Sequence, residues 1–401
     1  MPMKKILMTA VILLTGCTTD IPHDTIKYDR IPSPAPRIEA DDKENDGYSP
    51  LNYERRKGIW LSYIDLAPML SADNADDFRE WFDTACSEIA DLGCNTIYVH
   101  VRPFGDAIYD SALFPPSEYL GGDYDPLEIM CETAHEYELS VHAWVNPLRL
   151  QTADKLAEFS GYTTADWFIE ENDRVSYVGE DGHLWLDPAY PEVRELIADG
   201  AYEIAENYDI DGIHYDDYFY PTTDSEFDAK CFAENGGDNS LDEWRRDNIS
   251  KMCREIYERV KSVDSRIEVS ISPQGNMENN YYKLYADVEK WCSDGGYCDR
   301  IIPQIYFGYD NPVKPFISTL DEWRDICSSV KVSLDIGLAV YKISTDEEFT
   351  YNVGIIADQI DDCYNYQGIS LYTFGSLFGE DREDERIVHE REAIRKALAK
   401  Y

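Results

Sequence analysis

Eight short runs of β-branched and aromatic residues alternate with eight longer stretches of helical periodicity along most of this chain. The short runs cover residues 58–64, 95–102, 140–146, 210–216, 267–272, 301–306, 333–340 and 369–374. The helical stretches cover 75–92, 125–138, 192–207, 241–263, 281–292, 315–330, 354–366 and 387–400. Eight strand–helix units in strict order predict a parallel sheet that closes on itself, the α/β architecture of the (β/α)8 TIM barrel. An open doubly wound sheet is the alternative, but the first strand-to-helix turn lacks the glycine fingerprint of a dinucleotide site.

Within the predicted strands, one face is apolar and the opposite face is richer in polar and aromatic groups. In the second run, Val99 and Val101 share one face, while Tyr98, His100 and Arg102 share the other. In a barrel the apolar face packs under the helices and the other points inward. We therefore expect polar groups inside the barrel near the carboxyl ends of the strands, where barrel active sites lie. The alternative is an interior whose polar groups only satisfy one another.

The chain is longer than a minimal barrel. It has 401 residues, and the predicted barrel domain of residues 57–401 exceeds the roughly 250 residues that are typical of this fold. The excess lies in two long loops after the third and fourth strands, 147–191 and 217–240, on the face where we expect the site. Aromatic rings suit the apolar faces of pyranose sugars, but they can equally hold long loops against the barrel. Those in the two loops include Trp167, Tyr177, Trp185, Tyr190, Phe219 and Tyr220.

The N-terminus has the pattern of a bacterial lipoprotein signal. Two lysines precede a short apolar run over residues 6–14, which is too short to span a bilayer but typical of a signal peptide. The run leads into Leu14-Thr15-Gly16-Cys17, which looks like a lipobox. We predict a signal peptide over 1–16, a lipidated Cys17 and a flexible tether over 17–56, with the barrel anchored outside the cytoplasm to the cell membrane or the outer membrane. An ordinary secretory signal with a chance cysteine is the alternative.

Charge and cysteine usage exclude several classes of function. The chain has 36 Lys and Arg against 79 Asp and Glu, a net charge of −43, which would repel a nucleic acid and favours a neutral or cationic partner. Nine cysteines remain besides Cys17, and Cys292 and Cys298 are near enough in sequence to close a short loop. No cysteine or histidine cluster has the spacing of a zinc site, so we expect no metal and no cofactor.

Seven motifs resemble the family-ten glycosyl-hydrolase-like lipoproteins of bacteria, in the same order and over residues 55 to 375. The motifs are RKGIWLSYIDL (56–66), VHVRPFGDAIYDSALFP (99–115), HAWVNPLR (142–149), WLDPAYPEVRE (185–195), DGIHYDDYFYP (211–221), SISPQGN (270–276) and PQIYFGYDN (303–311). The resemblance implies a barrel hydrolase of bacterial surface polysaccharides, with cell-wall glycan strands as the favoured substrate. The chain is also similar, more remotely, to the hydrolase domain of exported amino-sugar polymer systems, in which an aspartate pair at the fourth strand is functional.

Glycoside hydrolysis usually needs two carboxyl groups, one protonated to release the leaving oxygen and one ionised as nucleophile or base. Asp216 is the carboxylate that the alternation places inward at the end of a central strand, and Asp217 begins the following loop. Repulsion between the two would raise one pKa, as a general acid requires. Alternatively, Asp217 only supports the loop and is not a catalytic group. In that case Asp106 in the second motif is the favoured second catalytic carboxyl beside Asp216, ahead of Asp65, Asp187, Glu278 and Asp310.

The other inward groups are predicted to bind substrate. Arg102 could alternatively pair with Asp216 or Asp106. The predicted substrate-binding residues are His100, Arg102, Trp144, Asn146, His214, Tyr218, Gln304, Tyr306 and Tyr372.

Two other functions remain open from the sequence. One is a non-catalytic carbohydrate-binding lipoprotein, and the other is a deacetylase of amino-sugar polysaccharides. A deacetylase would need a metal set of one aspartate and two histidines, which the sequence does not clearly supply.

Overall fold

The computed structural model describes residues 48–178, 182–328 and 331–401. The predicted signal peptide, Cys17 and the predicted tether up to residue 47 lie outside the described residues. No helix among the described residues is long and apolar enough to cross a membrane.

Eight parallel strands form a closed barrel, in the order β1-β11-β10-β9-β8-β7-β3-β2. This confirms the predicted fold. The strands are β1 (Arg56–Leu61), β2 (Thr96–Arg102), β3 (Ser140–Val145), β7 (Gly212–Tyr215), β8 (Glu268–Ile271), β9 (Arg300–Ile301), β10 (Ser333–Ala339) and β11 (Gly368–Tyr372). Each overlaps one of the eight predicted strands.

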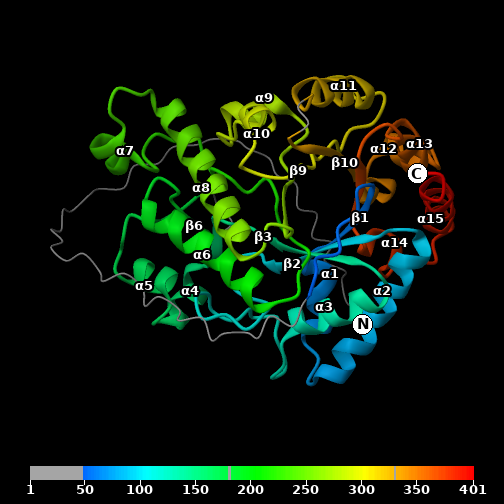
Figure 1. Cartoon of the computed structure of the whole chain (residues 1–401), viewed down its shortest axis with the longest axis horizontal. Coiled ribbons are helices and arrows are strands. Elements are labelled where there is room, and N and C mark those ends of the chain that lie inside the picture. Colours follow the sequence, from blue (N-terminus) through cyan, green and yellow to red (C-terminus); the bar gives the residue numbers. More distant parts are fainter. Residues whose placement is uncertain (1–47, 179–181, 329–330) are drawn as a thin grey trace, which may run out of the picture. The chain divides into compact units, whose positions relative to one another are not determined.

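Helices surround the barrel, and α6 and α8 pack side by side on its outside (Figure 1). Their ends follow the local sequence: Asn74 caps α2 by accepting from the Asp77 N–H, and Gly93 ends it with φ of 100°. The main helices are α1 (Tyr63–Leu70), α2 (Ala75–Leu92), α3 (Pro126–Glu136), α6 (Pro191–Asn207), α8 (Leu241–Val263), α11 (Phe316–Ile326), α13 (Ile355–Asp362) and α15 (Glu385–Leu398). Shorter helices are α4 (Ala153–Leu156), α5 (Thr163–Ile169), α7 (Ala229–Asn235), α9 (Met277–Tyr282), α10 (Val288–Asp294), α12 (Glu347–Tyr351) and α14 (Gly375–Phe378), with 3-10 turns η1 (Ala157–Phe159) and η2 (Val340–Ser344).

The predicted helix over 281–292 is two helices instead. α9 ends at Tyr282 and α10 begins at Val288, and between them Tyr285 has a φ of 54°. A left-handed residue cannot continue a right-handed helix, so the chain turns there.

Both long loops have structure of their own. The loop after β3 contains an antiparallel sheet of β4 (Arg149–Thr152), β6 (His183–Leu186) and β5 (Val175–Tyr177). The loop after β7 is held to α8 by Arg245, whose Nε and Nη2 donate to the two oxygens of Asp228 at 2.8 and 2.6 Å. Arg245 and Asp228 are both buried, so this ion pair fixes the loop that follows the aspartate pair.

The barrel has an apolar layer outside the strands and a separate cluster inside. The outer layer joins the strands to the helices, whereas Trp60, Tyr98, Trp144 and Ile302 form the inner cluster. This agrees with the predicted alternation, in which the inner face carries aromatic groups.

Residues 48–55, predicted as part of the tether, are packed against the barrel base, the end formed by the amino termini of the strands. The Leu51 N–H donates to Asp211, and the Asn52 side chain donates to the Asp211 carbonyl at 3.0 Å. β1 begins at Arg56, one residue before the predicted start of the barrel domain.

Candidate active site

Two adjacent aspartates stand at the carboxyl end of β7. We call the end of the barrel formed by the carboxyl ends of the strands its mouth. Asp216 is 5% exposed and accepts the Tyr218 N–H at 3.3 Å. Asp217 is half-buried, and each of its oxygens accepts a glutamine amide: Oδ2 from Gln274 at 3.0 Å and Oδ1 from Gln304 at 2.9 Å. The pair is therefore held by neutral donors.

The surroundings favour the protonated form of Asp216. Burial raises its pKa well above the usual value, and repulsion from Asp217 raises it further. The Tyr218 N–H, Trp144 and the Arg149 charge oppose this rise in part. Burial also raises the pKa of Asp217, and the two glutamine amides counter that rise. Both pKa values are raised, and repulsion from Asp217 acts on Asp216 in addition to burial, so Asp216 is the carboxyl that keeps its proton more readily.

His214 lies below the pair inside the barrel, and both of its ring nitrogens are engaged. Trp60 Nε1 donates to His214 Nε2 at 3.0 Å, so His214 Nδ1 carries the proton and donates to Ser270 Oγ at 2.9 Å. Burial lowers the pKa of His214 well below its usual value, which keeps it neutral. Its predicted role as a substrate contact is replaced here by a structural one, because no ring nitrogen is left to bind a sugar.

Aromatic rings line the mouth. Tyr306 and Tyr372 stack at 5.7 Å and are both half-buried. Trp144 stacks on His100 at 3.7 Å with the ring planes 9° apart, and it meets the Tyr372 ring edge-on at 6.4 Å. The pKa of Tyr306 is raised by burial first, and the charges of Asp216 and Asp217 contribute to the shift, so these rings and the acids share one site.

Several buried polar atoms of the mouth make no hydrogen bond of good geometry within the described part of the chain. These are both ring nitrogens of His100, Nε1 of Trp144 and Oδ1 of Asn146, although Trp144 lies close enough to Asp216, and Asn146 to His100, to shift the pKa of each. The other side of the Asn146 amide donates to the Pro103 carbonyl at 3.1 Å, which fixes its orientation. Buried polar groups are normally satisfied, so these atoms are candidates to bind a polar ligand.

Arg102 lies elsewhere than the alternation predicts. The pairing of β2 with β3 shifts register between His100 and Arg102, as at a β-bulge, and this turns Arg102 toward the helix layer. Its guanidinium lies over the Phe114 ring at 4.2 Å and fills the space beside Gly200 of α6, where a Cβ would collide with it. We therefore leave Arg102 out of the proposed substrate contacts.

Asp106 is buried in the loop after β2 and accepts the Phe104 N–H at 2.9 Å. None of its described contacts reaches Asp216 or Asp217. Burial raises its pKa. The structure thus brings Asp217, rather than Asp106, together with Asp216.

The sequence analysis missed one charged residue of the mouth, Arg149 at the start of β4. Its guanidinium lies over the rings of Phe104 at 4.9 Å and Tyr218 at 5.1 Å, and its charge acts on Asp216. Tyr218 also stacks on Trp185 at 6.0 Å. The signal was present, since Arg149 ends the matched motif HAWVNPLR, but it lies beyond the strand whose alternation was analysed.

The remaining candidate acids have other contacts. Asp65 is the third helical residue in the capping box of α1, whose N-cap is Ser62, and it accepts the Gly375 N–H at 3.1 Å. Asp187 accepts the Ala189 N–H at 2.9 Å, and burial raises its pKa to about 7. Glu278 lies in the first turn of α9, and the Asp310 N–H donates to Glu348 at 3.0 Å.

No group of three or more histidine, cysteine, aspartate or glutamate residues in the described part of the chain is arranged to hold a metal. The nine described cysteines are unbridged. Cys292 and Cys298 are not joined in a closed loop; Cys292 instead lies 2.9 Å (Sγ–Sγ) from Cys327, because α10 and α11 bring these two thiols together.

A sequence model of the glycosyl hydrolase-like 10 family matches residues 55–352, which include the aspartate pair and every strand from β1 to β10. The chain belongs to this family. Similar curated proteins are the glycosyl hydrolase YngK of Bacillus subtilis (strain 168), 33% identical, and the glycosyl hydrolase DigH of Escherichia coli (strain K12), 28% identical. The matches cover 72% of this chain, 61% of YngK and 73% of DigH.

Solved structures share the fold at low identity. The PgaB (BpsB) glycoside hydrolase domain from Bordetella bronchiseptica has a TM-score of 0.59 at 10% identity, covering 84% of this chain and 99% of that domain. The endo-1,4-beta-mannanase from Rhizomucor miehei has a TM-score of 0.55 at 12% identity, covering 86% and 95%. These likenesses confirm a barrel of the kind that glycoside hydrolases use. They do not bear on the substrate.

Proposed function

We propose that this glycosyl hydrolase-like protein is an active glycoside hydrolase of a bacterial surface polysaccharide, with cell-wall glycan strands as the favoured substrate. The observation that carries the proposal is the pair at the end of β7. Asp216 is buried with a raised pKa, and Asp217 beside it is held by the Gln274 and Gln304 amides. Catalytic residues of barrel enzymes come from such strand ends.

In this proposal Asp216 protonates the glycosidic oxygen as the sugar leaves. The half-buried rings of Tyr306 and Tyr372 offer apolar faces to sugar rings, and Trp144 and Asn146 offer polar atoms to hydroxyl groups. The net charge of −43 favours a neutral or cationic glycan over a strongly anionic one.

The test is to incubate the purified protein with purified, peptide-free wall glycan and to analyse the released fragments by mass spectrometry. New reducing ends support the proposal. Released acetate without new reducing ends indicates a deacetylase instead, and retention of the glycan without products indicates a binding protein. Either of the last two results overturns the proposal.

We also propose that Cys17 carries a lipid that anchors the protein outside the cytoplasm. The support is the sequence pattern alone. Cys17→Ala should release the protein from membranes and leave its activity on soluble glycan unchanged, as measured by fractionation and by the reducing-end assay. A variant that stays on membranes after a salt wash contradicts the anchor.

A further inference from the structure

The two acids of the mouth are attached to successive residues of one strand end. Glycosidases with a carboxylate nucleophile hold their two carboxyl groups about 5–5.5 Å apart on either side of the scissile bond, and inverting enzymes about 6.5–9.5 Å apart. Asp216 and Asp217 both follow β7 directly, so they approach a bound sugar from one side of the barrel. The question is which group attacks the anomeric carbon.

The strand ends across the barrel supply no carboxylate. Side chains alternate along a strand, so the next inward residue lies two positions after Ser270 at β8, Ile302 at β9, Gly337 at β10 and Ser370 at β11. These next inward residues are Ser272, Gln304, Ala339 and Tyr372, and none of them is an acid.

Two acids in the neighbouring loops, Asp65 and Asp106, accept hydrogen bonds from other parts of the chain. Both oxygens of Asp65 accept hydrogen bonds, Oδ2 from the Ser62 N–H at 2.8 Å and Oδ1 from the Gly375 N–H at 3.1 Å. Asp106 binds the Phe104 N–H of its own loop. Among the described acids, Asp217 is the one whose charge is shown to act on Asp216.

Asp217 itself is built as a fixed acceptor. Gln274 and Gln304 each donate to one of its oxygens, and Gln304 is fixed in turn by donating to the Ser272 carbonyl at 3.1 Å. Two amide donors draw charge from the carboxylate and make it a weaker nucleophile. They leave lone pairs that can accept a further N–H from a ligand.

We propose that the substrate supplies the nucleophile: the cleaved sugar carries a 2-acetamido group, Asp217 accepts its N–H, and Asp216 is the general acid. The inference rests on the proposed glycosidase function and names its mechanism and substrate class. Substrate-assisted hydrolysis of this kind is a known alternative to the two-carboxylate mechanisms.

The step balances without another reactant. The acetamido carbonyl oxygen attacks C1, the bond from C1 to the leaving oxygen breaks, and that oxygen takes the proton of Asp216. The resulting oxazolinium ion keeps its N–H bonded to Asp217. Water then attacks C1 and gives a proton to the Asp216 carboxylate, and the ring opens to restore the acetamide with retained configuration.

The first experiment uses the unmodified protein and a matched pair of glycans. Wall glycan is de-N-acetylated chemically, and one portion is re-acetylated while the other is trifluoroacetylated. Fluorine withdraws electrons from the carbonyl oxygen, so the rate of new reducing ends should fall about tenfold or more if that oxygen attacks C1. Nuclear magnetic resonance of the first products should show the retained anomer.

The second experiment separates the two acids. The substrates are dinitrophenyl glycosides of N-acetylated oligosaccharides, whose leaving group needs no proton. In the first turnover, Asp216→Asn should release dinitrophenol at close to the wild-type rate, because only the second step then needs Asp216, whereas Asp217→Asn should be slower by at least about a hundredfold. Matching thermal melts for both variants show that the fold is intact.

The outcomes distinguish this inference from the function on which it rests. Equal rates on the acetyl and trifluoroacetyl glycans, an inverted product, or rapid cleavage of sugars with a 2-hydroxyl group would leave the protein a glycosidase and overturn the inference. Absence of new reducing ends from any glycan overturns both.

Discussion

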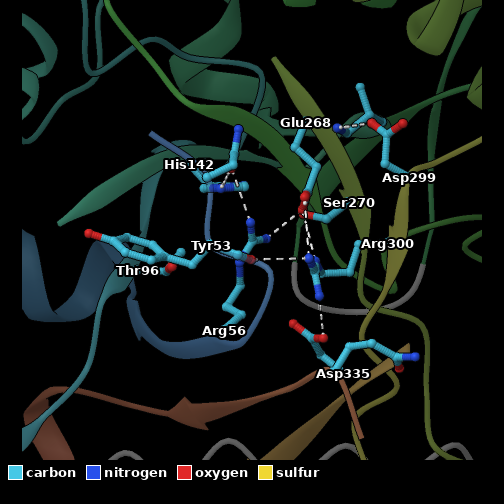
Figure 2. Close-up of polar contacts among 12 residues, drawn as sticks. Tyr53, Arg56, Thr96, His142, Glu268, Ser270, Asp299, Arg300 and Asp335 are labelled. Carbon is cyan, nitrogen blue, oxygen red and sulfur yellow. Dashed lines mark hydrogen bonds and ion pairs between the residues drawn. The ribbon is translucent and has the colours of Figure 1, made fainter. Parts of the chain in front are cut away.

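The two ends of the barrel both carry ionisable side chains on inward positions, but they neutralise the charges in different ways. At the base, Arg56 donates to Glu268 at 2.5 Å, and Arg300 donates to Glu268 at 3.0 Å and to Asp335 at 2.5 Å (Figure 2). At the mouth, Asp217 is bound by amides and Asp216 by a backbone N–H. Polar residues inside a barrel therefore do not identify the functional end by themselves.

The pairing changes the chemistry of the acids. Burial opposes ionisation of Glu268, but Arg56 and Arg300 outweigh it and hold the pKa of Glu268 below its usual value. Glu268 thus contributes stability above the pKa of the unfolded chain, and this contribution is lost as the pH falls. Asp216 has its pKa raised by burial and by Asp217. An ion network of this kind stabilises, whereas an unpaired acid can transfer protons.

The largest expected effect is at the mouth. Asp216→Asn removes the proton donor with almost no change in shape, so turnover on wall glycan should fall by a factor of about 10²–10⁴. The measurement is the initial rate of new reducing ends. The matched control is Asp187→Asn, a buried acid with a raised pKa in the loop after β3, for which we expect little loss of rate. An Asp216→Asn protein with normal turnover would contradict the assignment.

At the base, the expected effect is on stability instead. Arg300→Met leaves Asp335 buried without its ion-pair partner, and breaking such a pair costs about 3–5 kcal/mol of unfolding free energy. Denaturant unfolding at pH 7 measures this, and the turnover of the protein that remains folded should be unchanged.

The control for the base is an exposed pair. Arg395 binds Glu392 at 3.0 Å on the surface of α15, and Arg395→Met should leave the unfolding free energy nearly unchanged. If Arg300→Met lowers turnover while leaving stability intact, the division between the two ends is wrong.

Much of the fold was predictable because it depends on local patterns. The eight strands follow from runs of β-branched residues. Inward positions such as His214 and Asp216 follow from the alternation of side chains between the two faces of a strand. Arg102 was misplaced because a register shift between paired strands leaves no mark in either sequence alone. The antiparallel sheet after β3 was missed because its strands have only three or four residues.

The site was predictable only in part, for a related reason. Asp216 and Asp217 are adjacent in sequence, so their proximity needed no tertiary information. The donors that define Asp217 come from Gln274 and Gln304, which lie 57 and 87 residues away along the chain. The base network likewise joins Arg56, Glu268 and Asp335 from distant strands. Such contacts become visible once the barrel closes.

A smaller effect is expected where a buried ion pair supports the mouth. Arg245→Lys cannot keep both hydrogen bonds to Asp228, so the loop after β7 should loosen, with a loss of about 1–3 kcal/mol of unfolding free energy. Turnover should fall about tenfold, because small displacements of catalytic groups are costly. The control is Arg246→Lys, whose described hydrogen bond is a 3.4 Å contact with the Tyr281 carbonyl. If Arg245→Lys has the same stability and turnover as Arg246→Lys, the ion pair of Arg245 with Asp228 does not position Asp217.

The smallest effect concerns the stability cost of an unpaired acid. Because the folded pKa of Asp216 is raised, the unfolded chain releases this proton at a lower pH than the folded chain does, so the residue destabilises the fold as the pH rises above about 3.9. Asp216→Asn removes that penalty. Its melting temperature should match the wild type near pH 3 and exceed it by about 2 °C at pH 8.

Glu268→Gln should show the opposite dependence on pH. It should be less stable than the wild type at pH 8 and equally stable in acid, because the ionised carboxylate of Glu268 is the form that stabilises the fold. Parallel melting curves for these two variants across pH would show that the two ends of the barrel treat their acids alike.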